Sequence, residues 1–297
     1  MNEPGTFSAR PLAPIRAGNL VMRFGERPYI MGVLNVTPDS FSDGGRFFDR
    51  DKAVEQALAM IEQGADILDI GGESTRPGSE AVPAVDEIER VVPVIEIVAK
   101  YASVPISIDT TKSTVARAAI EAGAAMVNDV SALRFDPAMG ELVAKSGVPL
   151  VVMHMRGAPK TMQSGPIIYR DLMGEIRAFL EEALERARRA GIPEQTLIID
   201  PGIGFGKTAE HNLMILKRLG ELRSLDRPIL VGASRKAFIG KVLDVEEGRR
   251  LLGTAAAVAA AVLAGAHILR VHDVGPMRQV AAVAHAIYRE SLPPSGG

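Results

Sequence analysis

The chain has 297 residues, and its 34 Lys and Arg side chains nearly balance 36 Asp and Glu side chains. No overall basic character therefore points to a nucleic acid or an anionic membrane as a partner. The absence of Cys excludes disulfides, thiolate nucleophiles and Cys-ligated zinc, and the five His residues form no H-E-x-x-H zinc motif.

Residues 1–28 contain several prolines and scattered charges, without the apolar run that a secretory signal requires. We therefore expect a cytoplasmic protein in which these residues form an N-terminal extension. The segment LVMRFGERPYI, residues 20–30, is consistent with a short hairpin before the first core strand.

From residue 29 onward, short apolar runs alternate with longer segments of helical periodicity. The predicted strands are YIMGVL (29–34), DILDIGG (66–72), VPISID (104–109), AAMVND (124–129), VPLVVMHM (148–155), TLIID (196–200), PILVG (228–232) and HILRV (267–271). The predicted helices lie at about 52–63, 85–100 and 113–121, around Leu142 and Val143, at 169–190, around Leu213 and Leu216, at 251–264 and at 276–289.

Eight such units in a chain of this length indicate one (β/α)8 TIM barrel of parallel strands over residues 29–297. An open doubly wound sheet is the alternative fold.

Residues 251–269 lack Asp, Glu, Lys and Arg and are long enough to span a bilayer. Gly265 interrupts this stretch, which favours a buried helix followed by a strand.

In a TIM barrel the active site lies at the carboxyl ends of the strands. Polar side chains end every predicted strand: Asn35, Asp69, Asp109, Asn128, His154, Asp200, Ser234 with Lys236, and Arg270 with His272. Each one alone could cap a helix or bond a loop. Together, the Asp and Asn acceptors suit a flat heterocycle rich in N–H groups, and the Lys, Arg and His donors suit phosphate.

Arg270 and His272 alternate with Val271, so both would point to the same face of a strand. Beside Asn35 they would hold a diphosphate, with a Mg²⁺ ion shared between the diphosphate and the Asn35 amide oxygen. The Gly-rich loop DPGIGFGKT, 200–208, matches neither the P-loop nor the dinucleotide motif. It favours close approach of a ligand to the backbone, with Phe205 available for stacking.

These segments resemble those of the dihydropteroate synthases, a family of pterin-binding barrels. The resemblance runs from about residue 29 to the C-terminus through LNVTPDSFSDGG, DIGGESTRPGS, SIDTTK, NDVSAL, MHMRGAPKTMQ, DPGIGFGKT, SRKAFIG and RVHDV. It implies condensation of 6-hydroxymethyl-7,8-dihydropterin diphosphate with p-aminobenzoate, with Mg²⁺ as cofactor and a homodimer as the assembly.

The resemblance also implies the site residues. Pterin would contact Asp109, Asn128, Met153, Asp200 and Lys236, and diphosphate would contact Asn35, Thr75, Arg270 and His272, with Asn35 as the metal ligand. The p-aminobenzoate site would comprise Phe41, Thr75, Arg76, Pro77, Phe205, Ser234 and Lys236. The catalytic residues would be Asp43, Asp109, Asp200, Lys236, Arg270 and His272.

The chemistry favours an SN1-like displacement, in which loops 36–51 and 72–84 close and exclude water from a carbocation. Two other functions stay open at this point. A methyltetrahydrofolate-dependent corrinoid methyltransferase shares the pterin acceptors but does not need Arg270, His272 or the STRPGS loop. A non-catalytic paralogue that binds pterin or diphosphate would keep the site without turnover.

Overall fold

The computed structural model describes residues 12–37, 46–74 and 78–292. Eight strands form its main sheet: β3 (Tyr29–Asn35), β4 (Ile67–Gly71), β5 (Ile106–Asp109), β6 (Met126–Asp129), β7 (Leu150–Met153), β8 (Leu197–Asp200), β9 (Leu230–Val231) and β10 (Ile268–Val271). Neighbouring strands are parallel, and β3 lies between β4 and β10. A parallel bridge between Ile199 and Ile229 joins β8 to the segment that leads into β9, so the sheet closes.

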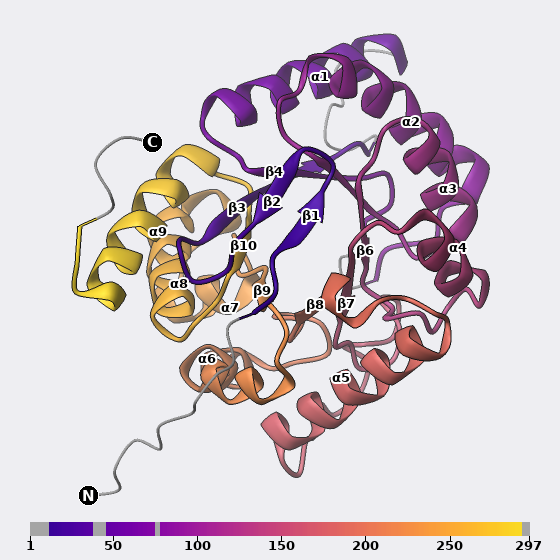
Figure 1. Ribbon diagram of the computed structural model, residues 1–297. Helices are drawn as coiled ribbons and strands as arrows, with labels where there is room; N and C mark the ends of the chain where they lie inside the picture. The colour runs from indigo at the N-terminus through magenta and orange to yellow at the C-terminus, as the bar shows by residue number, and fades with distance from the viewer. Residues whose placement is uncertain (1–11, 38–45, 75–77, 293–297) are drawn as a thin grey trace, which may run out of the picture.

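Helices surround this barrel (Figure 1): α1 (Arg46–Glu62), α2 (Ala84–Tyr101), α3 (Ser113–Glu121), α4 (Ala138–Ser146), α5 (Leu172–Arg189), α6 (Ala209–Arg218), α7 (Ala237–Leu243), α8 (Leu251–Leu263) and α9 (Val274–Arg289). Short 3-10 turns, η2 (Glu194–Thr196), η3 (Leu219–Leu225) and η4 (Glu247–Arg249), lie in the connections. The (β/α)8 prediction is confirmed, and the open doubly wound sheet is wrong.

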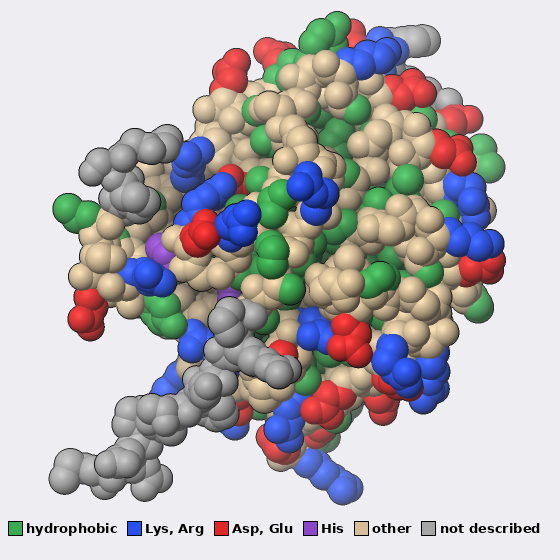
Figure 2. Space-filling model, in the orientation of Figure 1, with side chains coloured by type: hydrophobic (Ala, Val, Ile, Leu, Met, Phe, Trp, Pro, Cys, Tyr) green, Lys and Arg blue, Asp and Glu red, His purple; other side chains and the backbone are tan. Residues whose placement is uncertain are grey.

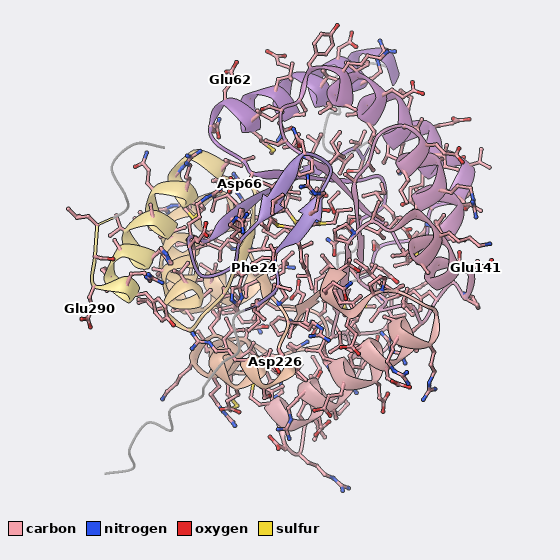
Figure 3. The ribbon with its side chains drawn as sticks, viewed as in Figure 1. Phe24, Glu62, Asp66, Glu141, Asp226 and Glu290 are labelled. Carbon is pink, nitrogen blue, oxygen red and sulfur yellow. The ribbon has the colours of Figure 1, made fainter. Side chains whose placement is uncertain are left out.

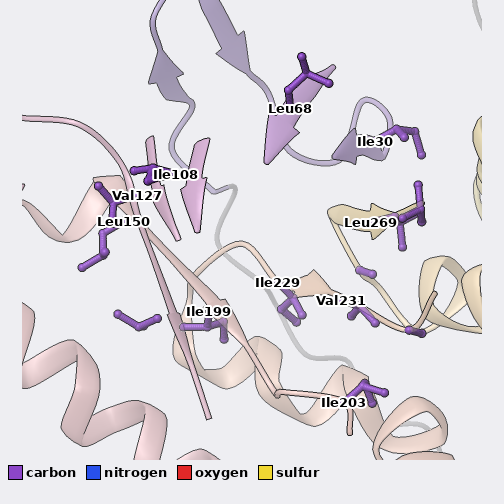
Figure 4. Close-up of a cluster of buried hydrophobic side chains, with 14 of the residues drawn as sticks. Ile30, Leu68, Ile108, Val127, Leu150, Ile199, Ile203, Ile229, Val231 and Leu269 are labelled. Atoms are coloured by element: carbon purple, nitrogen blue, oxygen red, sulfur yellow. The ribbon is translucent and has the colours of Figure 1, made fainter. Parts of the chain in front are cut away.

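The main core lies between the strands and the helices. Side chains alternate across a strand, so residues such as Ile30, Leu68, Ile108 and Leu150 point outward, and Figure 4 shows them around the barrel wall. The helices cover this ring with their apolar faces, and burial of these faces is the main stabilising contribution to the fold.

The Ala-rich segment forms α8 and is followed by β10, which confirms the predicted helix and strand. Only one face of α8 is buried, however, and Leu252 on the other face is 81 % exposed. Among the described residues, no helix is both long and apolar enough to cross a membrane.

A hairpin closes the N-terminal end of the barrel. Its strands, β1 (Ile15–Ala17) and β2 (Leu20–Met22), are antiparallel and are joined at Gly18, whose φ of 55° suits a tight turn. The hairpin predicted within residues 20–30 is therefore wrong, because its actual turn lies earlier. A Gly-Asn pair between two short apolar runs was the missed signal.

The hairpin lies across the barrel in Figure 1, which views the N-terminal end. Ile15, Ala17 and Met22 pack on Met31 and other inward-pointing residues of the strands. Arg27 and Asp66 form a bidentate ion pair, and Figure 3 shows Asp66 at this end of the barrel. The space-filling view of the same end shows hydrophobic side chains near its centre and charged ones around them (Figure 2).

Candidate active site

A cavity of about 720 Å³ opens at the carboxyl ends of the strands, at the end of the barrel that faces away from the viewer in Figure 1. This volume suits a small-molecule ligand. The predicted site residues in its wall are Asn35, Asp109, Phe205, Ser234, Lys236, Arg270 and His272. They come from strand ends far apart in the sequence, as the barrel prediction requires.

A buried group of charges lies at the base of this site. Arg270 donates from Nε to Asp69 Oδ2 and from Nη2 to Asp109 Oδ2, each at 2.6 Å. Asn128 donates to the same Asp69 oxygen at 3.0 Å. Asp69 is 0 % exposed, and the second oxygen of each carboxylate has no hydrogen-bond partner within the described part of the chain. Asp109 also lines the cavity, so its unpaired oxygen is an acceptor for a ligand N–H.

Burial raises the pKa of Asp109 to about 7, and Arg270 opposes this shift while Asp69 adds to it. The Arg270 guanidinium loses solvation in the same way, but the two carboxylates more than compensate and raise its pKa. This placement refines the sequence interpretation, which directed Arg270 only toward diphosphate. Its guanidinium turns to the carboxylates because a buried cation needs a charged partner.

Asp200 and Met153 lie opposite each other at the ends of β8 and β7. Burial raises the pKa of Asp200 to about 6, opposed by the Gly202 N–H, which donates to its carboxylate at 2.6 Å, and by nearby cations. Met153 packs with Phe205 in a small apolar cluster. A carboxylate beside an apolar wall is suited to a flat ring that carries N–H groups at its edge.

Lys236 lies over the ring of Phe205, with Nζ 4.5 Å from the ring centroid, within the range of a cation–π contact. Both side chains line the cavity. Lys236 is also the residue that precedes α7, a seven-residue helix that the sequence analysis did not predict because it is too short for a clear periodicity.

His272 and Ser234 pair across neighbouring strand ends, with His272 Nδ1 3.1 Å from Ser234 Oγ. Burial and three nearby cations lower the pKa of His272 to about 4. The imidazole is therefore neutral at pH 7, so it offers an N–H donor to an anion and not a full positive charge. An anion bound beside it would raise this pKa.

Five predicted residues, Phe41, Asp43, Thr75, Arg76 and Pro77, lie outside the described residues. The predicted loop 36–51 is too long, because α1 already begins at Arg46. The predicted end of the second loop, at residue 84, is one residue late, because α2 begins at Ala84.

Two residues of the site were not assigned a role from the sequence. Asp69 was recognised as a strand-end acceptor, but its bond to Arg270 joins residues 201 positions apart and leaves no local signal. Lys207 also lines the cavity, although its motif was set aside because it fits no nucleotide-binding pattern. His154, by contrast, is a core imidazole packed on Phe179 with the ring centroids 4.8 Å apart.

The family model for pterin binding enzymes matches residues 31–272. The chain is 48 % identical over 277 residues to a dihydropteroate synthase of Synechocystis sp., which covers 93 % of this chain and 96 % of that relative.

Solved structures agree. Dihydropteroate synthase of Yersinia pestis in a sulfonamide complex matches with a TM-score of 0.88 and 43 % identity, over 94 % of this chain and 100 % of that one. The enzyme of Xanthomonas albilineans in complex with 7,8-dihydropteroate matches with a TM-score of 0.83 and 42 % identity, over 93 % and 98 %. The chain therefore belongs to the pterin-binding enzyme family, and within that family to the dihydropteroate synthases.

Proposed function

We propose that this protein condenses 6-hydroxymethyl-7,8-dihydropterin diphosphate with p-aminobenzoate to give 7,8-dihydropteroate and diphosphate. One observation carries the proposal: the buried acceptor Asp109 and the cationic donors Lys236 and Arg270 line a single cavity of suitable size at the mouth of the barrel. The relative from Xanthomonas albilineans was solved in complex with 7,8-dihydropteroate, the product of this reaction.

The pterin ring is assigned to Asp109, Asn128, Met153, Asp200 and Lys236. The unpartnered oxygen of Asp109 and the carboxylate of Asp200 would accept from ring N–H groups, while Met153 would pack along the ring face. Lys236 would donate to a ring acceptor. The same carboxylates would stabilise positive charge that develops on the ring during the reaction.

The diphosphate is assigned to Asn35, Thr75, Arg270 and His272. Arg270 reaches the cavity from between two carboxylates, which accept from Nε and from Nη2, so its other N–H groups would be available to diphosphate. His272 would donate from its neutral ring, and proximity of the diphosphate charge would favour uptake of a proton there. That proton would help to stabilise the leaving group.

Mg²⁺ fits this donor set. Asn35 lines the cavity with an amide oxygen, a ligand type that Mg²⁺ accepts. In the residues that the structure covers, no three His, Asp or Glu side chains are grouped to hold a metal ion. Asn35 would therefore share the ion with diphosphate oxygens and water, and the bound ion would offset negative charge on the leaving group.

The p-aminobenzoate site is assigned to Phe41, Thr75, Arg76, Pro77, Phe205, Ser234 and Lys236. Phe205 would contact the aromatic ring of this substrate, and Lys236 and Ser234 offer donors at the same wall of the cavity. Asp43, which lies outside the described residues, is assigned to the catalytic set.

The reaction is proposed to be dissociative, with cleavage of the carbon–oxygen bond before the aryl amine attacks. Positional isotope exchange within the pterin diphosphate, in the absence of p-aminobenzoate, tests this step. Exchange is expected when the diphosphate can rotate and return. Its absence under those conditions would contradict a reversible ionisation.

The overall function is tested by an assay for diphosphate release with both substrates and Mg²⁺. Release that depends on p-aminobenzoate and yields dihydropteroate supports the proposal. Pterin binding without any release would instead identify a non-catalytic pterin-binding protein.

The protein is further proposed to act in the cytoplasm as a homodimer. Exposed apolar side chains on neighbouring helices support the dimer: Leu252 on α8, and Val283 and Ile287 on α9 (Figure 1). Light scattering should give twice the mass of one chain, and Leu252→Lys should reduce it. Val85→Lys on α2, which is also exposed, should leave the mass unchanged.

A further inference from the structure

Lys207 is a buried lysine at the end of the Gly-rich loop 200–208. It is 3 % exposed, although lysine is rarely buried without a partner. Its ammonium nitrogen lies 2.8 Å from His154 Nδ1 and donates to the carbonyl oxygens of Phe205 at 3.1 Å and of His154 at 3.4 Å. These three acceptors match the three N–H groups of an ammonium.

The His154 ring is fit to accept one of these bonds. Burial, together with the charges of Lys207 and Arg134, lowers the pKa of His154 to about 2, so the ring is neutral. It packs between Phe179 and Tyr169 in the core. Lys207 thus ties the Gly-rich loop to the end of β7 through a residue that the proposed reaction does not use.

The loop around Phe205 is held at each of three successive carbonyl groups. Gln163 Nε2 donates to the Gly204 oxygen at 3.0 Å, Lys207 to the Phe205 oxygen, and Tyr169 Oη to the Gly206 oxygen at 2.9 Å. Among these three donors, Lys207 alone is cationic, and its bond is at the residue whose ring lines the cavity. Its bond therefore sets the position of the Phe205 backbone most directly.

Lys207 also lies close to Asp200, because it contacts the carbonyl oxygen of His154 at 3.4 Å and the backbone N–H of His154 donates to the Asp200 carbonyl oxygen at 2.9 Å. The positive charges of Lys236, Lys207 and Arg270 oppose the rise in the pKa of Asp200 that burial causes. Burial lowers the pKa of Lys207 itself to about 7, while Asp200 raises it and Lys236 lowers it. The lysine and the carboxylate therefore favour each other's ionised forms.

We propose that Lys207 is a positioning residue of the active site, which fixes the Phe205 backbone against β7 and helps to keep the Asp200 carboxylate ionised. This inference rests on the proposed function, because it takes Phe205 to contact p-aminobenzoate and Asp200 to bind the pterin ring. Removal of the ammonium group should therefore cause two defects that can be measured separately, one in the pH dependence of pterin binding and one in the KM for p-aminobenzoate.

Lys207→Met tests the proposal, because methionine keeps much of the apolar stem and removes the charge. Lys217→Met, on the exposed face of α6, is the matched control. Binding of 6-hydroxymethylpterin, which carries no diphosphate, is measured by calorimetry across the pH range of about 5 to 8.5. This readout does not depend on turnover.

In the wild type, pterin affinity should fall as Asp200 takes up a proton near its pKa of about 6. In Lys207→Met this fall should occur at a pH higher by about one unit, because a stabilising cation has been lost. Asp109 also titrates, but it is present in every variant, so the difference reports on Lys207. The second defect should be a KM for p-aminobenzoate raised about tenfold, with no such change in Lys217→Met.

Wild-type pH dependence and an unchanged KM in a folded Lys207→Met protein would overturn the inference. If the wild type itself binds no pterin, the proposed function fails instead. Lys207→Arg keeps the charge and should keep the pH dependence of pterin binding while raising the KM for p-aminobenzoate. Should Lys207→Met fail to fold, Lys207→Arg decides, and a shifted pH dependence in it contradicts the proposal.

Discussion

The two ends of the barrel use the same strands for opposite purposes. Near the N-terminal end, inward-pointing residues pack on the hairpin: Ile67, Met126, Ile198 and Ile268. Two positions further along those strands stand Asp69, Asn128, Asp200 and Arg270. A step of two residues, about 7 Å, therefore takes the barrel interior from an apolar plug to a group of charges.

The two ends of the barrel also have opposite effects on the free energy of unfolding. The apolar end stabilises the fold by burial. At the other end burial raises the pKa values of Asp109 and Asp200 to about 7 and about 6. Because an unfolded chain ionises these groups more readily, their burial lowers the free energy of unfolding as the pH rises above the unfolded pKa. Contacts elsewhere in the barrel have to offset this loss of stability at the site.

The sharpest test of this contrast is Asp200→Asn. We expect the turnover number to fall about a thousandfold, because a preorganised negative charge beside the developing cation is lost. At about pH 8 the free energy of unfolding should rise, because the buried charge is gone, and this gain should shrink as the pH falls toward about 4. Steady-state kinetics and urea unfolding measure the two effects, and wild-type turnover would rule out the assigned role.

Met22→Ala probes the apolar end. Met22 belongs to the hairpin and is fully buried against the barrel, so its truncation should lower the free energy of unfolding by about 3 kcal/mol. The turnover number of the folded protein should not change. Met214→Ala makes the same chemical change at a 40 % exposed position of α6 and should alter stability by less than about 0.5 kcal/mol. A large loss of turnover in Met22→Ala would show that the ends are not independent.

His272→Ala tests whether His272 contacts the diphosphate leaving group or the pterin ring. The dissociation constant for pterin diphosphate should rise about tenfold, because a donor to the diphosphate is removed. Affinity for 6-hydroxymethylpterin should stay within about twofold of the wild type. Calorimetry with the two ligands makes the comparison, with His285→Ala at the opposite end of the barrel as control. Equal losses for both ligands would place His272 at the ring.

His267→Gln should have the smallest effect. His267 Nδ1 accepts from the Ile229 N–H at 3.0 Å, and burial lowers its pKa to about 4. A buried base with a lowered pKa destabilises the fold as the pH drops from about 6.5 toward that value. Glutamine can still accept the hydrogen bond but does not titrate. The slope of the free energy of unfolding against pH should therefore decrease, by an amount that corresponds to the uptake of less than one proton on unfolding. Urea unfolding at several pH values measures it, and an unchanged slope would contradict the assignment.

The sequence was sufficient to predict the barrel and the convergence of polar strand ends at one mouth, because strand ends in a parallel barrel must converge. It could not supply the partners of Arg270, which lie 161 and 201 positions away, since no local pattern encodes such pairs. The hairpin was placed too late because its two strands are only three residues long. Lys207 was missed because its function depends on its burial and on its contact with β7.

The hairpin has a consequence for the movement of substrates. By sealing one end it makes the described part of the barrel a blind tube, which both substrates enter and both products leave through the same mouth. If the pterin ring binds as proposed, at the buried charges at the base of the site, it would have to bind before p-aminobenzoate. The closed end of the barrel would then impose an order of addition, and dihydropteroate would have to leave before the next pterin could enter.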